Sequence, residues 1–192
     1  MEFVDHGEAI EALSEQGLRE ASAGEDLFGL TMDNSDDVVH LHFACADSTS
    51  TPHEGADVVS IEKDRLPDAV EHLLHKLHLT QVLLIPVGKW RKVFDAVAFS
   101  LADNEDWQAV DTAATVALNT RDPLLCEPAE FHTINALIRA LFNDAENTDQ
   151  GLMLTTTTAP VLVELVPGGA VRISIGDPVL ADEVVETFGS AM

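Results

Sequence analysis

The sequence predicts an α+β (or α/β) protein built on a mixed β-sheet. Two stretches of the chain have the pattern strand, helix, strand, and a later stretch has the pattern of a β-hairpin followed by a helix. Strand–helix–strand units normally form right-handed parallel crossovers, whereas a hairpin pairs its strands antiparallel, so both orientations are expected in one sheet. With 192 residues, 46% of them hydrophobic, we expect 1–192 to form a single compact domain, or two related halves of about 1–103 and 104–192.

The first third of the chain is expected to contain one helix and three strands. Asp5, with Glu8 three residues later, resembles a capping box, and apolar residues follow on one side, which indicates a helix over about 5–21. The expected strands are 26–32, 37–46 and 57–62, the first two joined by the turn "DNSD" and the last two separated by a polar loop over 47–56.

The middle of the chain contains a weak internal repeat. The expected elements are helix 65–79, strand 81–87, helix 89–102, strand 122–127 and helix 129–142, while the stretch over 107–118 is left without an assigned element. Segment 57–77 aligns without gaps on segment 122–142, and both have the order strand, Glu, short Pro-containing turn and amphipathic helix. Identical residues are few, so duplication and independent origin both stay open.

The segment "VLVELVPGGAVRISI" (161–175) has the clearest pattern, that of a β-hairpin. A three-residue loop, Pro167-Gly168-Gly169, places Glu164 opposite Arg172. It also gathers the apolar residues of both strands on one face, whereas a two-residue loop would mix the faces. The residues expected on that face are Val161, Val163, Leu165, Val171, Ile173 and Ile175. Asp177 then caps a last helix that has Pro178 at its first position.

The chain is strongly acidic, with a formal net charge of −24 at pH 7. We therefore do not expect it to bind nucleic acid, because a polyanion would be repelled at long range. Two interpretations of the acidity stay open. The surface is adapted to saline surroundings, which the small number of lysines favours, or it binds a basic or aggregation-prone partner.

The sequence predicts a cytoplasmic protein without a membrane segment. The longest apolar runs, 82–87 and 161–166, are far shorter than the roughly 20 residues needed to cross a bilayer. The first residues are acidic and lack the basic leader and apolar run of a signal peptide. The two cysteines, Cys45 and Cys126, make no disulfide framework.

Three histidines at every third position, in "EHLLHKLHL" (71–79), are the first candidates for a metal site. On a helix, His72, His75 and His78 fan out opposite the leucines and face water, so we expect no metal site there. His40 and His42 share one face of a strand, and they would join such a site only if that face met the outer side of the helix.

Cys126 is the candidate nucleophile, because it lies where a strand passes into a helix, with Glu127 and His132 as possible bases. In the repeat, the position that matches Cys126 is Ile61. An apolar counterpart favours a buried strand position, and free cysteines are commonly buried. We therefore expect no catalytic residue here.

The segment "PVGKWRKVF" (86–94) contains the one cluster of basic residues. Lys89, Arg91 and Lys92 surround Trp90 at a helix start, which favours an anion or a protein partner. The phosphate-loop signature is absent. The alternative is that Trp90 belongs to a buried stripe, with Val93, Phe94, Val97 and Leu101, while the cations pair with nearby carboxylates.

The leading functional hypothesis is a non-catalytic protein-binding or self-associating module that uses Lys89, Trp90, Arg91 and Lys92. Its partner would be another protein or a second copy of the chain, and no cofactor is expected. The alternative is a small-ligand or anion-binding protein, or an enzyme, that uses the helix start at 89–92 or Cys126. Whether the chain is an enzyme stays open.

Overall fold

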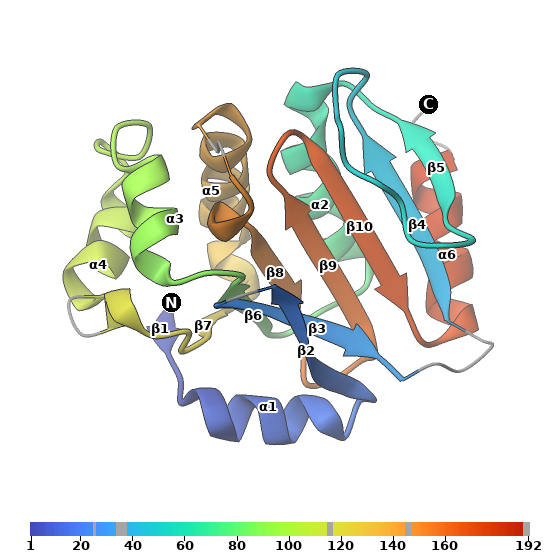
Figure 1. Ribbon diagram of the computed structural model, residues 1–192, viewed down its shortest axis with the longest axis horizontal. Helices are drawn as coiled ribbons and strands as arrows, with labels where there is room; N and C mark the ends of the chain where they lie inside the picture. The colour runs from blue at the N-terminus through green and yellow to red at the C-terminus, as the bar shows by residue number, and fades with distance from the viewer. Residues whose placement is uncertain (25, 34–37, 115–116, 145–146, 190–192) are drawn as a thin grey trace.

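A computed structural model (Figure 1) describes residues 1–24, 26–33, 38–114, 117–144 and 147–189. The strands are β1 (Glu2–Phe3), β2 (Leu18–Gly24), β3 (Leu27–Met32), β4 (Val39–Ala44), β5 (Asp57–Ser60), β6 (Val82–Pro86), β7 (Leu124–Cys126), β8 (Leu152–Thr155), β9 (Val161–Val166) and β10 (Ala170–Ile175). The helices are α1 (His6–Ser14), α2 (Leu66–Lys76), α3 (Trp90–Val97), α4 (Glu105–Ala113), α5 (Phe131–Asp144) and α6 (Pro178–Gly189), with short 3₁₀ turns between some elements.

Eight of the strands form one sheet in the order β1-β7-β6-β8-β9-β10-β4-β5, and β2 and β3 form a separate pair. Every neighbouring pair in the large sheet is antiparallel except β4 and β5, which are parallel. The predicted α+β class with a mixed sheet is therefore confirmed.

The two helical crossovers connect strands that run in the same direction without being neighbours. α5 leads from β7 to β8, and β6 lies between them, antiparallel to both. α2 leads from β5 to β6, and β4, β10, β9 and β8 lie between these two strands. Antiparallel strands are thus inserted between strands that the crossovers alone would place side by side.

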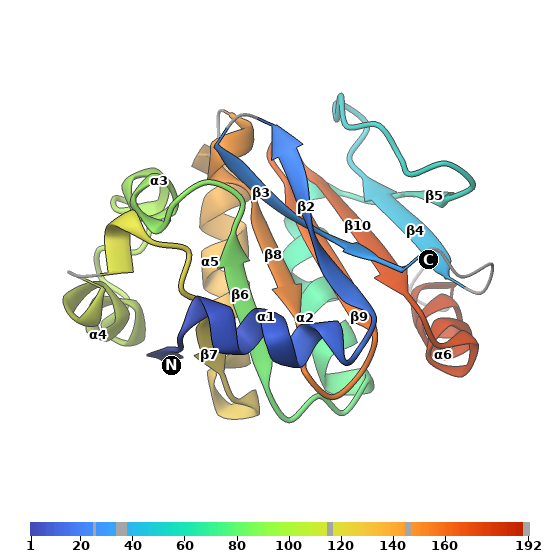
Figure 2. The same ribbon diagram turned by 60° about the horizontal axis from the view of Figure 1, so that its bottom comes forward.

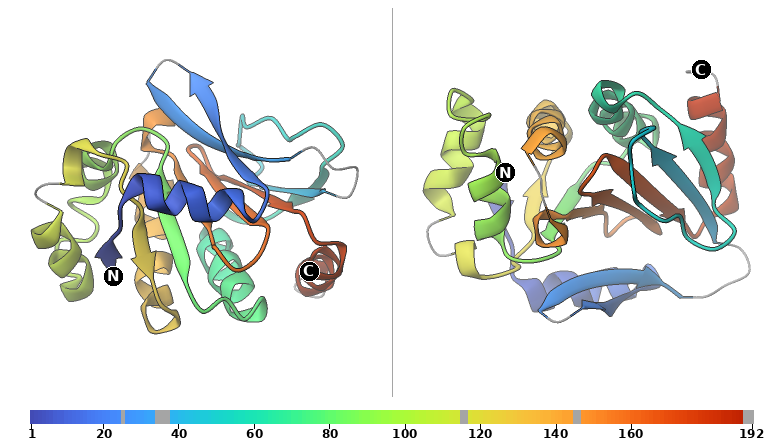
Figure 3. Two further views of the ribbon diagram at one scale, coloured as in Figure 1. Left: turned by 90° about the horizontal axis from the view of Figure 1, so that it is seen from below. Right: turned by 45° about the horizontal axis from the view of Figure 1, so that its top comes forward.

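All helices except α1 form a layer on one face of the sheet (Figures 1 and 3). α2 and α5 pack against each other, α3 packs against α5, and α6 contacts α2 and β10. The larger hydrophobic core lies between this layer and the sheet, and it contains both tryptophans, Trp90 and Trp107. No helix within the described ranges has the length and apolar character needed to span a bilayer.

The β2–β3 hairpin and α1 lie across the opposite face of the sheet, as Figure 2 shows. A second core lies beneath them, and it joins Leu13, Leu18, Phe28, Leu30 and Met32 to Leu83, Ile85, Met153 and Leu162 of the large sheet. Central strands are thus buried on both faces. This explains why β6 has the uninterrupted apolar sequence "VLLIP" rather than an alternating one.

The predicted helix over 5–21 is wrong in its second half. α1 ends at Ser14, and Gly17 adopts a left-handed conformation with φ of 75°. A left-handed glycine after the last turn ends a helix, and the chain from Leu18 onward pairs with β3 instead. The expected turn "DNSD" between strands 26–32 and 37–46 lies mostly outside the described residues, and the two strands belong to different sheets.

The predicted hairpin at 161–175 is confirmed residue by residue. Ala170 pairs with Val166 and Arg172 pairs with Glu164, which leaves the expected three-residue loop. Gly168 and Gly169 of that loop have φ of 94° and 85°, values that side-chain-bearing residues rarely adopt. The six apolar residues expected on one face all lie in the larger core. The predicted cap is also present, since the Asp177 carboxylate accepts a hydrogen bond from the backbone N–H of Val179 at 2.8 Å.

The two segments of the predicted repeat have the same local order of strand, 3₁₀ turn and helix. Their strands occupy different places, because β5 is an edge strand and β7 lies between β1 and β6. The duplication itself, and the division into halves, stay predictions.

The two cores are expected to unfold together as one cooperative domain. Leu30→Ala, in the second core, and Leu137→Ala, in the larger core, should each lower the free energy of unfolding by about 2–5 kcal/mol. Urea unfolding would be followed by circular dichroism and by fluorescence of the two tryptophans, which report on the larger core. Coincident transitions are expected for both variants. An early transition in Leu30→Ala without a change in fluorescence would show that the hairpin layer unfolds separately.

Candidate functional site

Trp90 lies in the larger core rather than on the surface. Its side chain is fully buried, and its indole Nε1–H donates a hydrogen bond to the carbonyl of Asp122 at 2.8 Å. The other members of the expected stripe, Val93, Phe94, Val97 and Leu101, are buried with it. The buried stripe of the alternative interpretation is therefore confirmed. We leave Trp90 out of the candidate site because no partner can reach it.

The three cations around Trp90 are exposed at the start of α3. Lys89, Arg91 and Lys92 border a pocket of about 360 Å³. Two of them already have polar neighbours, since Arg91 Nε donates to Asn119 Oδ1 at 3.3 Å and Lys92 Nζ lies 3.6 Å from Asp149 Oδ2. The carboxylate of Asp149 partly cancels the positive charge at this helix start.

Cys126 is fully buried in the larger core. Burial raises the pKa of its thiol far above the usual range, so the thiolate is strongly disfavoured. Both possible bases, Glu127 and His132, are exposed, and His132 Nε2 lies 2.9 Å from Asp106 Oδ2. The thiol is thus placed for packing, as its apolar counterpart Ile61 indicated.

The three histidines of α2 and its C-terminal turn are exposed, and the leucines of the helix face the core, as expected. His75 Nε2 lies 3.9 Å from Glu71 Oε1. Within the described ranges, no group of three or more His, Cys, Asp or Glu side chains is arranged to hold a metal ion.

His40 and His42 share a strand face, but that face points away from α2. Leu41 and Phe43, which alternate with them, pack into the larger core beside the helices. The condition for a site shared with the α2 histidines is therefore not met. His40 instead belongs to a pocket on the other face of the sheet.

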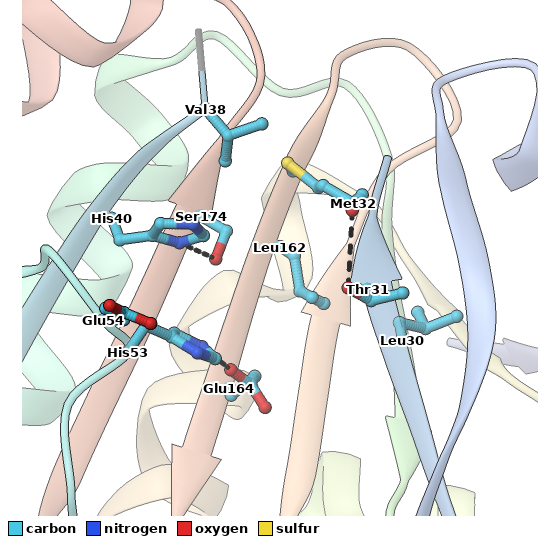
Figure 4. A pocket seen from close by; sticks show the side chains of 10 residues that line it. All are labelled: Leu30, Thr31, Met32, Val38, His40, His53, Glu54, Leu162, Glu164 and Ser174. Carbon is cyan, nitrogen blue, oxygen red and sulfur yellow. Dashed lines mark hydrogen bonds and ion pairs between the residues drawn. The ribbon is translucent and has the colours of Figure 1, made fainter. Parts of the chain in front are cut away.

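This pocket of about 270 Å³ lies between β3 and the large sheet (Figure 4). We call it the two-histidine pocket. Its polar side chains come from β4, the β4–β5 loop, β9 and β10, and they are His40, His53, Glu54, Glu164 and Ser174. Its apolar side chains are Leu30, Met32, Val38 and Leu162, and Thr31 also borders it.

Strand register brings these side chains together. Ser174 of β10 pairs with His40 on one side and with Leu162 on the other, so the three side chains lie in one row across the sheet. Glu164 lies two residues beyond Leu162 on the same face. α1 and the β2–β3 hairpin cover the apolar part of this face, and the pocket opens where the polar part begins.

Two hydrogen bonds order the histidines, and both are drawn in Figure 4. His40 Nδ1 lies 2.9 Å from Ser174 Oγ, and His53 Nε2 lies 2.8 Å from Glu164 Oε2. The two imidazole rings are 5.0 Å apart between centroids. The bond from His53 ties the β4–β5 loop to the sheet.

Arg172 strengthens this attachment from the margin of the pocket. Its Nη1 lies 4.0 Å from Glu164 Oε1, and its Nε–H donates to the carbonyl of Thr51 at 3.0 Å. Glu164 therefore holds both the loop histidine and the cross-strand arginine that the sequence pattern placed opposite it.

The electrostatics of the pocket favour positive charge. Burial, and secondarily the charge of His53, lowers the pKa of His40, so its imidazole is neutral at pH 7. Glu54 and Glu164 supply carboxylates, and no lysine or arginine appears among the described residues that line the pocket. Arg172, beside it, offsets part of the charge of Glu164.

His42 lies beside the pocket and is almost completely buried, with an exposed fraction of 1%. Its Nδ1 has no hydrogen-bond partner within the described part of the chain. Burial, assisted by the positive charge of Arg172, lowers the pKa of His42. An unsatisfied buried nitrogen opposes stability, because the group loses its hydrogen bond to water on folding.

The Ser174–His40 pair resembles part of a hydrolase triad, but its setting does not suit acyl transfer. Ser174 lies within β10, which pairs with β9 on one side and β4 on the other, so its backbone N–H faces a neighbouring strand. That amide is not free to stabilise an oxyanion as a nucleophile elbow would. The arrangement is suited to hydrogen bonding with a ligand and to proton exchange.

Sequence reasoning identified part of this site without recognising it. It paired Glu164 with Arg172 and placed His40 with His42 on one face. It missed the contribution of His53, because a polar loop has no hydrophobic periodicity from which its contacts with the sheet could be predicted. A sharper signal was the polar character of alternate positions on β4, β9 and β10, which marks a face not covered by apolar residues.

Comparisons with known proteins identify no relative, since no protein-family model, no curated protein and no solved structure matches this chain.

Cys126 is expected to resist alkylation in the folded protein. In a Cys45→Ser background, iodoacetamide at pH 8 should modify Cys126 about 100-fold more slowly in the native state than in urea, because the thiol is buried and its ionisation is disfavoured. Mass spectrometry of timed samples measures both rates. Rapid labelling of the folded chain at neutral pH would restore Cys126 as a candidate nucleophile.

Replacing His42 with a side chain of similar size is expected to stabilise the protein. His42→Leu should raise the free energy of unfolding by about 1 kcal/mol at pH 7, because it removes a buried nitrogen without a partner. The gain should grow as pH falls below the unfolded-state value near 6.5. The pKa of His42 is lowered in the folded protein. As pH falls, the imidazole therefore takes up a proton more readily in the unfolded state, and the wild-type protein loses stability.

Urea titrations between pH 5 and 7.5 measure this difference. His72→Leu, at an exposed position on α2, is the matched control and should change stability by less than about 0.5 kcal/mol at pH 7. A destabilised His42→Leu protein would mean that the imidazole makes a contact of value in the native state.

Proposed function

We propose that this protein is a non-catalytic binding protein that holds a small organic cation in the two-histidine pocket. The observation that carries the proposal is the composition of the pocket wall. It combines two carboxylates, two imidazoles and an apolar side, and no described lysine or arginine lines it. Pockets that combine an apolar wall with a few convergent polar groups are the usual sites of small ligands.

The carboxylates are suited to an ammonium or guanidinium group. Glu54 has no hydrogen-bond or ion-pair partner among the described residues, so it is free to pair with a ligand. Glu164 is held in place by His53 and Arg172. Charge-assisted hydrogen bonds to two such groups are stronger than neutral ones.

The apolar side of the pocket limits the rest of the ligand. Leu30, Met32 and Leu162 are buried side chains that border the pocket, and they offer contact to a short alkyl chain. A volume of about 270 Å³ is at the low end for small-molecule sites, so a ligand with few heavy atoms is favoured.

The overall charge supports the same ligand class. A net charge of −24 raises the local concentration of cations around the whole surface and lowers that of anions. This counts against the alternative of an anion at Lys89–Lys92, because the pocket beside these cations is also lined by Asp26 and Asp149. The cytoplasmic location and the protein partner or homo-oligomer expected from the sequence remain proposals.

n-Butylammonium is a suitable first probe. At about ten times its dissociation constant it should stabilise the fold by about 1.4 kcal/mol, which corresponds to a rise of about 3–5 °C in Tm for a chain of this length. Differential scanning fluorimetry at constant chloride concentration measures the shift. n-Butanol and butyrate, which match its length without its charge, should produce no shift.

The pocket is tested with two variants of equal charge change. Glu164→Gln should weaken binding of n-butylammonium about tenfold, because it removes one carboxylate while keeping the side-chain shape. Glu186→Gln, at an exposed position on α6, should bind as the wild type does. An equal response to butyrate, or full affinity in Glu164→Gln, would contradict the proposal.

A further inference from the structure

β5 (Asp57–Ser60) is an edge strand whose outer side is open. Among the described strands it pairs with β4 alone, and the backbone N–H of Ile61 donates to the carbonyl of Ala44 at 3.1 Å. Backbone groups of successive residues in a strand point to alternate sides. Since Ile61 and Val59 point toward β4, the N–H and C=O groups of Val58 and Ser60 point outward, where the described structure supplies no partner.

An apolar side chain accompanies these open backbone groups. Val58 is 62% exposed, while its neighbour Val59 packs against the larger core on the opposite face of the sheet. Figure 1 shows β5 at one margin of the molecule, in front of α6. An exposed apolar residue on an open edge is the feature that natural proteins usually avoid, because it invites strand addition.

A hollow of about 380 Å³ adjoins the end of β5. Its wall includes Ser60 and the carboxylates of Asp47 and Glu62, with Lys63 as the single cation. Asp57, at the start of the strand, is also exposed. The edge therefore presents open backbone groups between two acidic ends, with space for a long side chain beside one of them.

We propose that β5 is a docking edge for an extended basic segment of a protein partner, which adds to the sheet as a further strand. Main-chain hydrogen bonds to Val58 and Ser60 would supply affinity, an apolar residue would cover Val58, and a lysine or arginine would enter the acidic hollow. A second copy of the chain is disfavoured as the occupant, because pairing β5 with β5 would bring two acidic edges together. This proposal does not depend on the two-histidine pocket.

Strand addition is tested with a fluorescein-labelled peptide, Lys-Val-Lys-Val-Lys-Val-Lys, with blocked ends. Fluorescence anisotropy in 50 mM and in 300 mM KCl should show binding that weakens as salt rises. A Glu-Val peptide of the same length should not bind. Two further peptides carry N-methyl groups on alternate residues, one in each phase. One of them should lose binding about tenfold and the other should keep it, because alternate amides face β5.

The edge itself is tested with Val58→Pro, compared with Val58→Thr. Proline removes the outward N–H of residue 58, which the ladder with β4 does not use, so circular dichroism and Tm should change little. Val58→Pro should bind the Lys-Val peptide about tenfold more weakly than Val58→Thr. Should Val58→Pro fail to fold, the pair of N-methylated peptides against the wild-type protein still decides the question.

Three results would overturn the proposal. Equal binding of both N-methylated peptides would show that charge alone holds the peptide. If Glu164→Gln weakens binding of the peptide and Val58→Pro leaves it unchanged, the peptide lies in the two-histidine pocket. A rise in mass by light scattering as salt increases, without peptide binding, would make a second copy the occupant of the edge.

Discussion

Burial of the central strands on both faces is the constraint on which the rest of this structure depends. In β6, Leu84 contributes to the core beneath the helices and Ile85 to the core beneath the β2–β3 hairpin. A sheet of this kind needs a second layer, and α1 with the hairpin supplies it. That layer is narrower than the sheet, so it covers β6, β8 and part of β9 but leaves the same face of β10 and β4 to the β4–β5 loop.

The two-histidine pocket follows from this incomplete cover. Where the apolar layer ends, the strand residues on that face become polar, and Glu164, Arg172 and Ser174 replace leucine and methionine. The loop closes over them through hydrogen bonds rather than apolar contacts, which leaves space and charge together. The buried His42 Nδ1 shows that this closure is incomplete in hydrogen bonding as well.

The same loop relates the two proposed binding regions. It leaves β4, contributes His53 and Glu54 to the pocket, and enters β5, whose outer edge is open. Both regions are acidic and both favour a positively charged ligand, one a small cation and the other an extended segment. The general acidity of the surface promotes encounter with either, and local geometry distinguishes them, because the pocket is enclosed by side chains and the edge offers backbone groups.

The sequence by itself determined the class of the fold, the exposure of the α2 histidines to water, and the register of the β9–β10 hairpin. It offered the buried stripe of α3 as one of two interpretations. These features depend on periodicity, turn chemistry and caps within some fifteen residues, where local spacing decides which face is apolar. It placed the end of α1 wrongly, because a glycine in a left-handed turn and a pairing partner outweighed helix propensity. Only the tertiary structure decided that Trp90 is buried, that β4 separates from β3, and that His53 meets Glu164 across 111 positions of sequence. Contacts of such separation depend on how layers stack and where a polar loop finds its hydrogen bonds, and no local pattern encodes either.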